Sequence, residues 1–350
     1  MTLIGMLHYR KKPHDVKKAF ACASIAKMYG VSFVYFSYRS VDFANKIING
    51  WIFSEGRWTQ RKVNFPDSII NISPPKTHKQ TIIRKALKRS IPFISHSIGN
   101  KMSVFRRIEE GGSFSQFLIP TQSISQVDDV ISFIKKYTRL VIKPHSGSKG
   151  RSIFFITLLE DQTIRCITGL EVNHYTWEDF KVFIRRLIQQ QKYLIQPFIE
   201  CKTKAGLTYD FRLHVQKDAA GKWAINLIYP RVSGNDKLTS NISSGGYRGE
   251  LIPFLVEEFG EDYFNIKQLL EYFAVSFASH FESLYKHRSF DELGIDVAID
   301  QQQRLWIYEV NWRPGSKNRE FSVAKNLIPY ARYVAESNRK KRRKMERLKN

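Results

Sequence analysis

The chain has 350 residues, 43% hydrophobic and 25% charged, which is ordinary for a globular protein of two or three domains. It contains no apolar run of about 18 residues and no signal-peptide pattern, so neither a membrane span nor secretion is expected. Its three cysteines are scattered without a CxxC motif, which argues against disulfides or a zinc site and favours a reducing cytoplasm.

The charge is strongly positive, with 56 basic and 32 acidic residues and a formal net charge of +24. Part of it lies in the C-terminal segment 338–350, where eight basic residues accompany one acidic residue. Such a field attracts polyanions, including acidic polymers and nucleotide phosphates. A solvated tail that only keeps the protein soluble is the simpler interpretation of the C-terminal cluster.

Apolar periodicity predicts a small α/β unit at the N-terminus. The expected elements are strands at 2–9 and 31–38, a helix at 15–30, a hairpin at 51–66 that turns at Glu55-Gly56, and a basic helix within 73–94. Further along, helices are expected at 100–112, 125–137, 177–191 and 268–287, a hairpin at 139–156, and strands at 193–200, 209–218, 223–233, 293–300 and 305–312. The pattern indicates an α/β (α+β) protein with a first domain over residues 1–96.

The last two strands carry acidic and amide side chains. If Asp300 pairs with Leu305 across the turn, Asp296 lies opposite Glu309, and Glu309, Asn311 and Arg313 share one face. Two adjacent carboxylates repel unless a cation neutralises them, and carboxylate and amide oxygens suit Mg²⁺ or Mn²⁺. A water-exposed face of the hairpin is the alternative.

A second candidate feature is the segment VIKPHSGSKGRS, in which an apolar strand ends at Lys143 and a Gly/Ser loop follows. Gly147 and Gly150 allow backbone N–H groups to approach a phosphate, and Lys143 supplies a positive charge. It is not a Walker A loop, because that motif is absent and a strand follows. Taken alone, the segment is more simply interpreted as an ordinary hairpin loop with a lysine at a strand end.

Three further segments are candidates for binding. Pro197 in YLIQPFIE excludes a fully paired central strand, so free backbone groups there could receive a purine, although an edge strand is the simpler interpretation. In YDFRLHV, Asp210, Arg212 and His214 share one face, and Arg212 there suits an ion pair or a phosphate contact. A long polar loop containing Arg231 and Asn241 follows. No HExxH, GxSxG or GxGxxG motif occurs, so zinc hydrolase, serine hydrolase and Rossmann functions lack support.

The order of these motifs resembles the ATP-grasp superfamily, and most of all its YheC/YheD endospore coat-associated family. The resemblance rests on Lys101, the Lys143 hairpin, QPFIE, DFR, RVS with NISSGG, Asp296 and EVN. It implies an ATP-grasp domain over residues 97–335, with a nucleotide-covering part at 97–205 and a metal and substrate part at 206–335. The small domain at 1–96 would precede it, and residues 336–350 would be a disordered basic tail.

The resemblance also implies roles for individual residues. Those expected to bind ATP are Lys101, Lys143, Ser146, Gly147, Ser148 and Gly150 at the phosphates, Gln196, Phe198 and Ile199 at the adenine, and Glu200 at the ribose. Because proline has no N–H, the backbone donor to adenine would come from Phe198 or Ile199. Asp296, Glu309 and Asn311 would hold Mg²⁺ or Mn²⁺. Arg212 and Arg231 would stabilise the transferred phosphoryl group, and Arg313 and Asn241 would meet the carboxylate substrate.

The function that the resemblance implies is an ATP- and Mg²⁺-dependent carboxylate–amine ligase that works in the cytoplasm through an acyl phosphate. Its substrates would be small-molecule or peptide carboxylates and amines, with coat proteins as further partners. One alternative is a catalytically silent, nucleotide-binding or structural coat protein. Another is a polyanion-binding protein that uses the basic tail, although a nucleic-acid partner is not expected.

Overall fold

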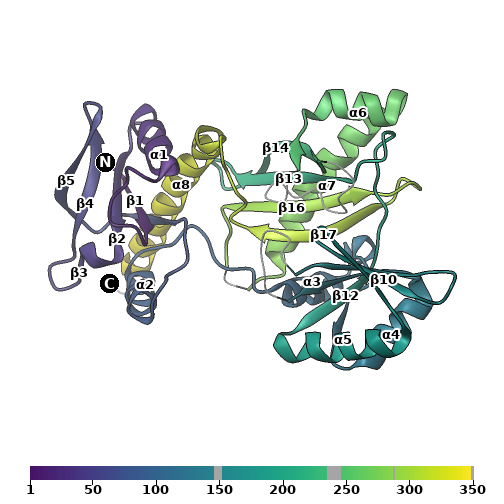
Figure 1. Cartoon of the computed structure of the whole chain (residues 1–350). Coiled ribbons are helices and arrows are strands. Elements are labelled where there is room, and N and C mark those ends of the chain that lie inside the picture. The colour runs from purple at the N-terminus through teal and green to yellow at the C-terminus, as the bar shows by residue number, and fades with distance from the viewer. Residues whose placement is uncertain (146–151, 235–245, 287, 348–350) are drawn as a thin grey trace.

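The computed structural model describes residues 1–145, 152–234, 246–286 and 288–347. They form three β-sheets with helices on their faces, and each sheet contributes to its own hydrophobic core (Figure 1). This mixed architecture confirms the predicted α/β (α+β) class. None of the described helices is long and apolar enough to cross a membrane.

The first sheet pairs β1 with β2 and β6 in parallel and carries an antiparallel hairpin at one edge. Its elements are β1 (Leu3–His8), α1 (Lys17–Met28), β2 (Ser32–Ser37), η1 (Tyr38–Ser40), β3 (Val41–Asp42), β4 (Ile47–Ser54), β5 (Arg57–Asn64), β6 (Ser68–Asn71) and α2 (His78–Ser90). The predicted strand–helix–strand opening is confirmed. So is the turn at Glu55-Gly56, where both residues have the positive φ that a tight hairpin requires.

The last helix, α8 (Glu320–Arg347), returns to this first sheet, so the two ends of the chain lie in one unit (Figure 1). Val323, Leu327 and Ile328 of α8 are buried in the same core as the apolar face of α1. The helix continues through residues 336–347, where the sequence predicted a disordered tail. That prediction considered apolar periodicity only, whereas polar contacts hold this part of the helix.

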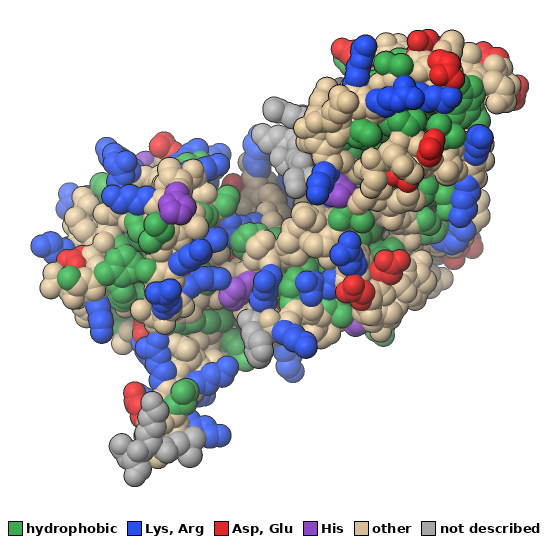
Figure 2. Space-filling view, turned by 90° about the horizontal axis from the view of Figure 1, so that it is seen from below, with side chains coloured by type: hydrophobic (Ala, Val, Ile, Leu, Met, Phe, Trp, Pro, Cys, Tyr) green, Lys and Arg blue, Asp and Glu red, His purple; other side chains and the backbone are tan. Residues whose placement is uncertain are grey.

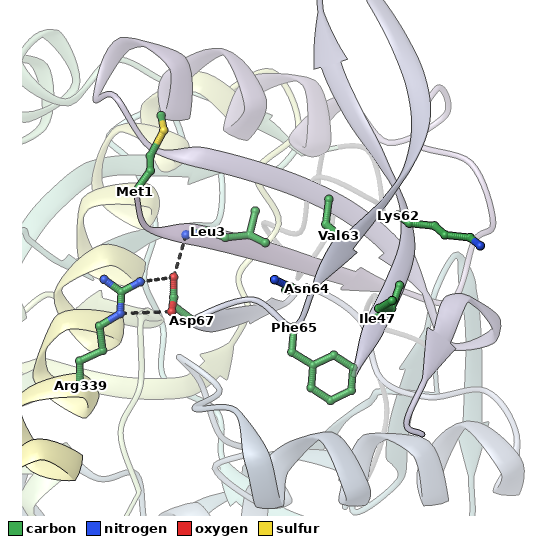
Figure 3. A pocket seen from close by; sticks show the side chains of 9 residues that line it. All are labelled: Met1, Leu3, Ile47, Lys62, Val63, Asn64, Phe65, Asp67 and Arg339. Carbon is green, nitrogen blue, oxygen red and sulfur yellow. Dashed lines mark hydrogen bonds and ion pairs between the residues drawn. The ribbon is translucent and has the colours of Figure 1, made fainter. Parts of the chain in front are cut away.

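Figure 3 shows one of these contacts beside a cavity of about 660 Å³. Arg339 Nε donates to Asp67 Oδ1 at 3.2 Å, and Asp67 Oδ2 accepts the Leu3 N–H at 2.8 Å. One turn further on, Arg342 donates to the Ser90 carbonyl at the end of α2. The helix end is therefore attached to the first sheet by charge-assisted hydrogen bonds.

The second sheet has the strand order β11-β10-β9-β8-β12-β7. The elements of this part of the chain are α3 (Lys101–Glu110), η2 (Ser115–Phe117), β7 (Gln122–Ile124), α4 (Val127–Tyr137), β8 (Arg139–Pro144), β9 (Phe154–Leu158), β10 (Ile164–Thr168), β11 (Glu171–Tyr175), α5 (Trp177–Gln190) and β12 (Tyr193–Pro197). Leu140 and Ile142 of β8 and Ile195 of β12 pack in one core with apolar residues of α4 and α5. Because side chains alternate along a strand, Val141, Lys143 and Gln196 project from the opposite face.

The expectation of an edge strand around Pro197 is wrong, because β12 lies between β8 and β7. Pairing with β7 ends at Ile195, whereas pairing with β8 continues to Pro197. Proline therefore stands at the strand end, beyond the last residue that pairs with β7.

The third sheet has the order β15-β14-β13-β16-β17. Its elements are β13 (Tyr209–Lys217), β14 (Trp223–Val232), β15 (Tyr247–Arg248), α6 (Leu251–Phe259), η4 (Gly260–Asp262), α7 (Tyr263–Ser283), β16 (Glu292–Ile299) and β17 (Leu305–Trp312). Phe273, Phe277 and Phe281 of α7 stack in series in the core beneath this sheet. α3 packs on the same core through Val104 and Ile108, which places its N-terminus beside β17.

Candidate active site

The acidic residues of the last hairpin are brought together by a β-bulge. Asp296 pairs with Glu309 as predicted, but the predicted pairing of Asp300 with Leu305 is wrong, since Leu305 pairs with Ile299. The register shifts by one residue between Asp296 and Val297, which leaves an extra residue, Tyr308, on β17.

The bulge decides which way the site residues face. Before it, Leu305 and Ile307 are buried in the core, and after it Val310 is buried there. Without the extra residue, strict alternation would place Glu309 and Asn311 on the same face as Leu305 and Ile307. The bulge turns them instead to the face that carries Asp296.

Asp296 is surrounded by guanidinium groups from the neighbouring strands. Arg212 donates to both carboxylate oxygens, with Nη2 at 3.0 Å from Oδ2, and Arg231 Nη2 lies 3.0 Å from the same oxygen. Arg231 is also paired with Asp210, to which its Nε donates at 2.7 Å. Burial alone would raise the pKa of Asp296, but Arg212 and Arg231 together hold that pKa below its usual value. The cations that neutralise Asp296 here are therefore arginines.

Glu309 stands at the open side of this network. Its Oε1 lies 3.6 Å from Lys101 Nζ, and its side chain is 31% exposed. Asn311 Nδ2 donates to Asp296 Oδ2 at 3.2 Å. Within the described residues no group of three His, Cys, Asp or Glu side chains is arranged to hold a metal. The set here is two carboxylates and an amide, whose hard oxygens fit Mg²⁺ or Mn²⁺ if Asp296 exchanges an arginine contact for the ion.

Lys143 faces the third sheet from the second one. Burial and the charge of Lys101 lower the pKa of its ammonium group, Glu309 and Asp296 oppose them, and the net value is about 8. That coupling places the lysine near the acidic pair. In the described ranges, no hydrogen bond or ion pair reaches the Lys143 side chain. A buried ammonium group without a partner is a binding point for an anion.

The segment expected to receive adenine is partly engaged by the protein itself. The Phe198 N–H donates to the Arg139 carbonyl at 2.9 Å, so it is not available as a donor to a ligand. Gln196 is buried and donates to Thr121 Oγ1 at 2.6 Å. Of the two backbone donors proposed, the Ile199 N–H is the one that donates to no partner among the described residues.

Glu200, the expected ribose ligand, is held by neighbouring cations. Arg139 Nη1 lies 3.1 Å from its Oε2, and the same guanidinium group stacks over the Phe198 ring at 4.5 Å. Tyr308, the bulge residue, donates to the Ile199 carbonyl at 3.3 Å, which joins this segment to the third sheet. The two sheets are thus fixed to each other beside the candidate site.

A cavity of about 300 Å³ opens between the N-terminus of α3 and β17. Its lining includes Lys101, Glu309 and Asn311, all of which the sequence predicted, and Asn100 and His145, which it did not. Asn100 caps α3 by accepting the Ser103 N–H at 2.9 Å. His145 lies 3.2 Å from Ser123 Oγ, and no motif marked it as a site residue.

Not every predicted residue joins this group. Ser146, Gly147, Ser148, Gly150 and Asn241 lie outside the described residues. Arg313 does not continue the Glu309 and Asn311 face, because β17 ends at Trp312 and Arg313 has a φ of +60°. Its guanidinium group stacks on the Trp312 ring at 3.6 Å.

Comparison with known proteins shows the family to which this chain belongs. A family model described as YheC/D-like ATP-grasp matches residues 90–334. The chain belongs to this family. It is 25% identical over 305 residues to the endospore coat-associated protein YheD of Bacillus subtilis strain 168, an alignment that covers 82% of this chain and 65% of YheD. This YheC/YheD family member therefore spans less than two thirds of the length of YheD.

A second curated relative is YheC of the same organism, 22% identical over 335 residues, with 91% of this chain and 90% of YheC covered. Among solved structures, the D-alanine–D-alanine ligase from Coxiella burnetii aligns with a TM-score of 0.56 at 11% identity and covers 99% of each chain. At that identity the likeness shows the fold alone. These matches confirm the expected ATP-grasp fold and family.

Proposed function

We propose that this protein is an ATP- and Mg²⁺-dependent carboxylate–amine ligase that works through an acyl phosphate. The observation that carries the proposal is that two lysines lie beside a set of carboxylate and amide side chains. Lys101 and Lys143, the latter without a partner in the described ranges, supply positive charge, and Asp296, Glu309 and Asn311 supply oxygen ligands beside it. ATP-grasp membership supports an ATP-dependent ligase.

In this proposal each group has a defined task. Lys101 and Lys143 bind the nucleotide phosphates, and the Ile199 N–H is the donor that adenine can use. Glu309, Asn311 and Asp296 hold the metal ion, which neutralises charge on the phosphates when bound. Arg212 is placed to stabilise the transferring phosphoryl group. The substrate carboxylate accepts that group, and an amine then displaces phosphate to form the amide bond.

The relatives' names support a role in the endospore coat. Both curated relatives are called endospore coat-associated proteins. We place the reaction in the cytoplasm, in spore coat formation, with a carboxylate and an amine supplied by small molecules, peptides or coat proteins. The alternative of a silent structural coat protein would keep the fold without turnover.

A polyanion-binding role is favoured by one observation, the abundance of lysine and arginine over acidic side chains on the face shown in Figure 2. It predicts binding that weakens steeply with salt and does not need Mg²⁺.

Calorimetric titration of ATP in Mg²⁺ and in EDTA tests the proposal, together with ADP release over a panel of amino acids, peptides and acidic polymers. We expect much tighter ATP binding with Mg²⁺, because the acidic pair repels a bare triphosphate. Equal ATP affinity in EDTA would remove the metal assignment. Metal-dependent binding with no turnover on any substrate would favour the silent coat protein.

A further inference from the structure

A second set of unpaired polar groups lies where the first sheet meets the end of β17. Within the described part of the chain, four buried donor atoms have no hydrogen-bond partner there: Tyr38 Oη, Arg84 Nε, Arg313 Nε and Arg313 Nη2. Tyr38 is only 2% exposed. Buried donors without partners are rare in folded proteins, and each one costs free energy unless a ligand or a water meets it.

Three separate segments bring these groups together. Tyr38 begins η1, directly after β2, and packs in one apolar cluster with Leu87 of α2 and with Phe93. Arg84 lies on that same helix, one turn before Leu87. Two residues beyond Phe93, Ser95 Oγ accepts the Trp312 Nε1–H at 2.7 Å, which fixes the indole on which Arg313 stacks.

The guanidinium group of Arg313 is both buried and charged. Burial lowers its pKa, Asp291 and Glu292 raise it in part, and Arg84 lowers it again, to a net value of about 10, so the group is protonated at neutral pH. No carboxylate of the described chain forms an ion pair with it. Stacking on Trp312 fixes the plane of the guanidinium group, which prepares it to bind a planar or tetrahedral anion through two N–H groups.

The other charged groups around it do not neutralise this charge. Lys88 and Arg288 also face the cluster, since Arg84, Arg288 and Arg313 together lower the pKa of Lys88 after its partial burial. The two acids that act most strongly on Arg313 are Asp291 and Glu292. Glu292 is already paired with Lys18 at 3.2 Å and His214 at 3.2 Å, and Asp291 Oδ1 has no partner within the described ranges. Positive charge therefore exceeds negative charge here.

We propose that Tyr38, Arg84 and Arg313 bind an anionic group, a carboxylate or a phosphate, of the molecule that the ligase modifies. Arg313 is two residues beyond Asn311, so its backbone lies at most about 7 Å from that of Asn311 on the metal-binding face. A single small molecule spans that distance. The substrate would then carry two anionic groups, one that reacts beside Glu309 and one that is held by the N-terminal unit.

That the bound anion belongs to a substrate rests on the proposed function, but the existence of the anion site does not. It is tested by calorimetric titration of the full chain with succinate and with inorganic phosphate, without nucleotide and then with saturating Mg·ADP. Titration with Mg·ADP alone is run first, so a failure of nucleotide binding is seen separately. Succinate tests whether the site binds a carboxylate group, and inorganic phosphate tests whether it binds a phosphate group.

The diagnostic variants are Tyr38→Phe, which removes only the hydroxyl, and Arg84→Gln. Lys85→Gln is the matched control, because it removes one positive charge from the neighbouring, exposed position of α2. We expect each diagnostic variant to weaken binding of the preferred anion about tenfold, the effect of one hydrogen bond to a charged group, and the control to change it less than twofold. Because the lost donors are unpaired, neither variant should lower the melting temperature.

Three results would overturn the proposal. The first is that neither anion binds under any condition. The second is equal weakening in all three variants, which would indicate general surface charge. The third is anion binding that survives Tyr38→Phe and Arg84→Gln but is lost in Lys143→Gln or on adding Mg·ADP, which would place the anion at the nucleotide phosphates.

Discussion

The third and the second sheet form two walls of the candidate site, and they differ in whether their charged side chains are paired. On the third sheet the ionisable groups are bound to one another, since Asp296 contacts Arg212 and Arg231, and Arg231 also contacts Asp210. On the second sheet Lys143 is half-buried and has no hydrogen-bond or ion-pair partner within the described residues, and its pKa is lowered to about 8.

The difference separates groups that neutralise one another in the folded chain from a group whose charge is left for a ligand. Arg212 packs over Gly294, where an added Cβ would lie 3.1 Å from Arg212 Nη1, so the ion-pair layer is built into the sheet. An unpaired buried ammonium group destabilises the folded state and is retained where a ligand needs it. Glu309, partly exposed and 3.6 Å from Lys101, lies between the two walls.

The largest effect is expected for Glu309→Gln, which keeps the volume of the side chain and removes its charge. If Glu309 holds the metal ion, ADP release should fall by orders of magnitude, because metal stabilisation of a transferring phosphoryl group supplies several kcal/mol. Folding should be normal, as seen in a thermal melt.

Glu271→Gln is the matched control for this variant, since Glu271 is also 31% exposed and pairs with a lysine, Lys267, at 2.8 Å. It should leave turnover unchanged. Wild-type turnover in a folded Glu309→Gln protein would exclude Glu309 from the metal site. The charge of Glu309 between the two sheets would then have no role in the reaction.

The next largest effect is on stability. Asp296→Asn leaves the buried Arg212 and Arg231 without their shared partner, so the free energy of unfolding should fall by about 3 kcal/mol. Urea denaturation with and without Mg²⁺ measures it. Stability equal to that of the wild type would show that the arginine layer is not a framework and that the comparison between the walls is wrong.

The sequence predicted part of this site and missed the rest for physical reasons. The pairing of Asp296 with Glu309 was predicted correctly, although from a turn register that the bulge at Tyr308 corrects. Spacing within one hairpin is local information. The neutralisation of Asp296 by Arg231 was not predicted, because it depends on how β13, β14 and β16 are ordered in the sheet.

The fold was predicted more completely than the contacts. Periodicity indicated the α/β class, and the order of motifs resembled that of the ATP-grasp superfamily, but neither contains information on how α8 meets the first sheet. Arg339 and Asp67 are far apart in the sequence, and the helical extension that joins them has no apolar period to reveal it. The anion site of Tyr38, Arg84 and Arg313 is equally non-local.

Lys143→Met should separate binding from stability on the second wall. ADP affinity in Mg²⁺ should fall about tenfold or more, as one charge-assisted contact is lost. The free energy of unfolding at neutral pH should stay the same or rise, because the folded-state pKa lies below the unfolded value and the charged form is disfavoured on folding. A variant that binds ADP normally or melts earlier would show that Lys143 is structural.

The same lysine predicts a pH dependence of smaller size. A bound phosphate favours the charged form, so ADP affinity should be constant below the free-protein pKa of about 8 and fall above it. Between about pH 7 and pH 9 the loss should approach tenfold, the effect of one pH unit beyond the pKa. Lys143→Arg, which stays protonated, should abolish this slope in calorimetric titrations. A slope that persists in Lys143→Arg would assign it to another group.

The smallest effect is expected for the exposed counterpart of the Asp296 ion pairs. Arg339 and Asp67 also form an ion pair, but their side chains are 43% and 26% exposed, against 11% and 7% for Arg212 and Asp296. Water already solvates both partners, so Arg339→Ala should lower the free energy of unfolding by less than about 1 kcal/mol, and added salt should reduce that loss.

Removal of residues 337–350 should lower the free energy of unfolding little more than Arg339→Ala does, because the apolar residues of α8 in the shared core end at Ala331 and Val334. Urea denaturation of both variants at low and high salt measures this. A loss as large as that of Asp296→Asn would mean that pairing, rather than burial, sets the strength of these contacts, and the contrast between the two walls would then need another cause.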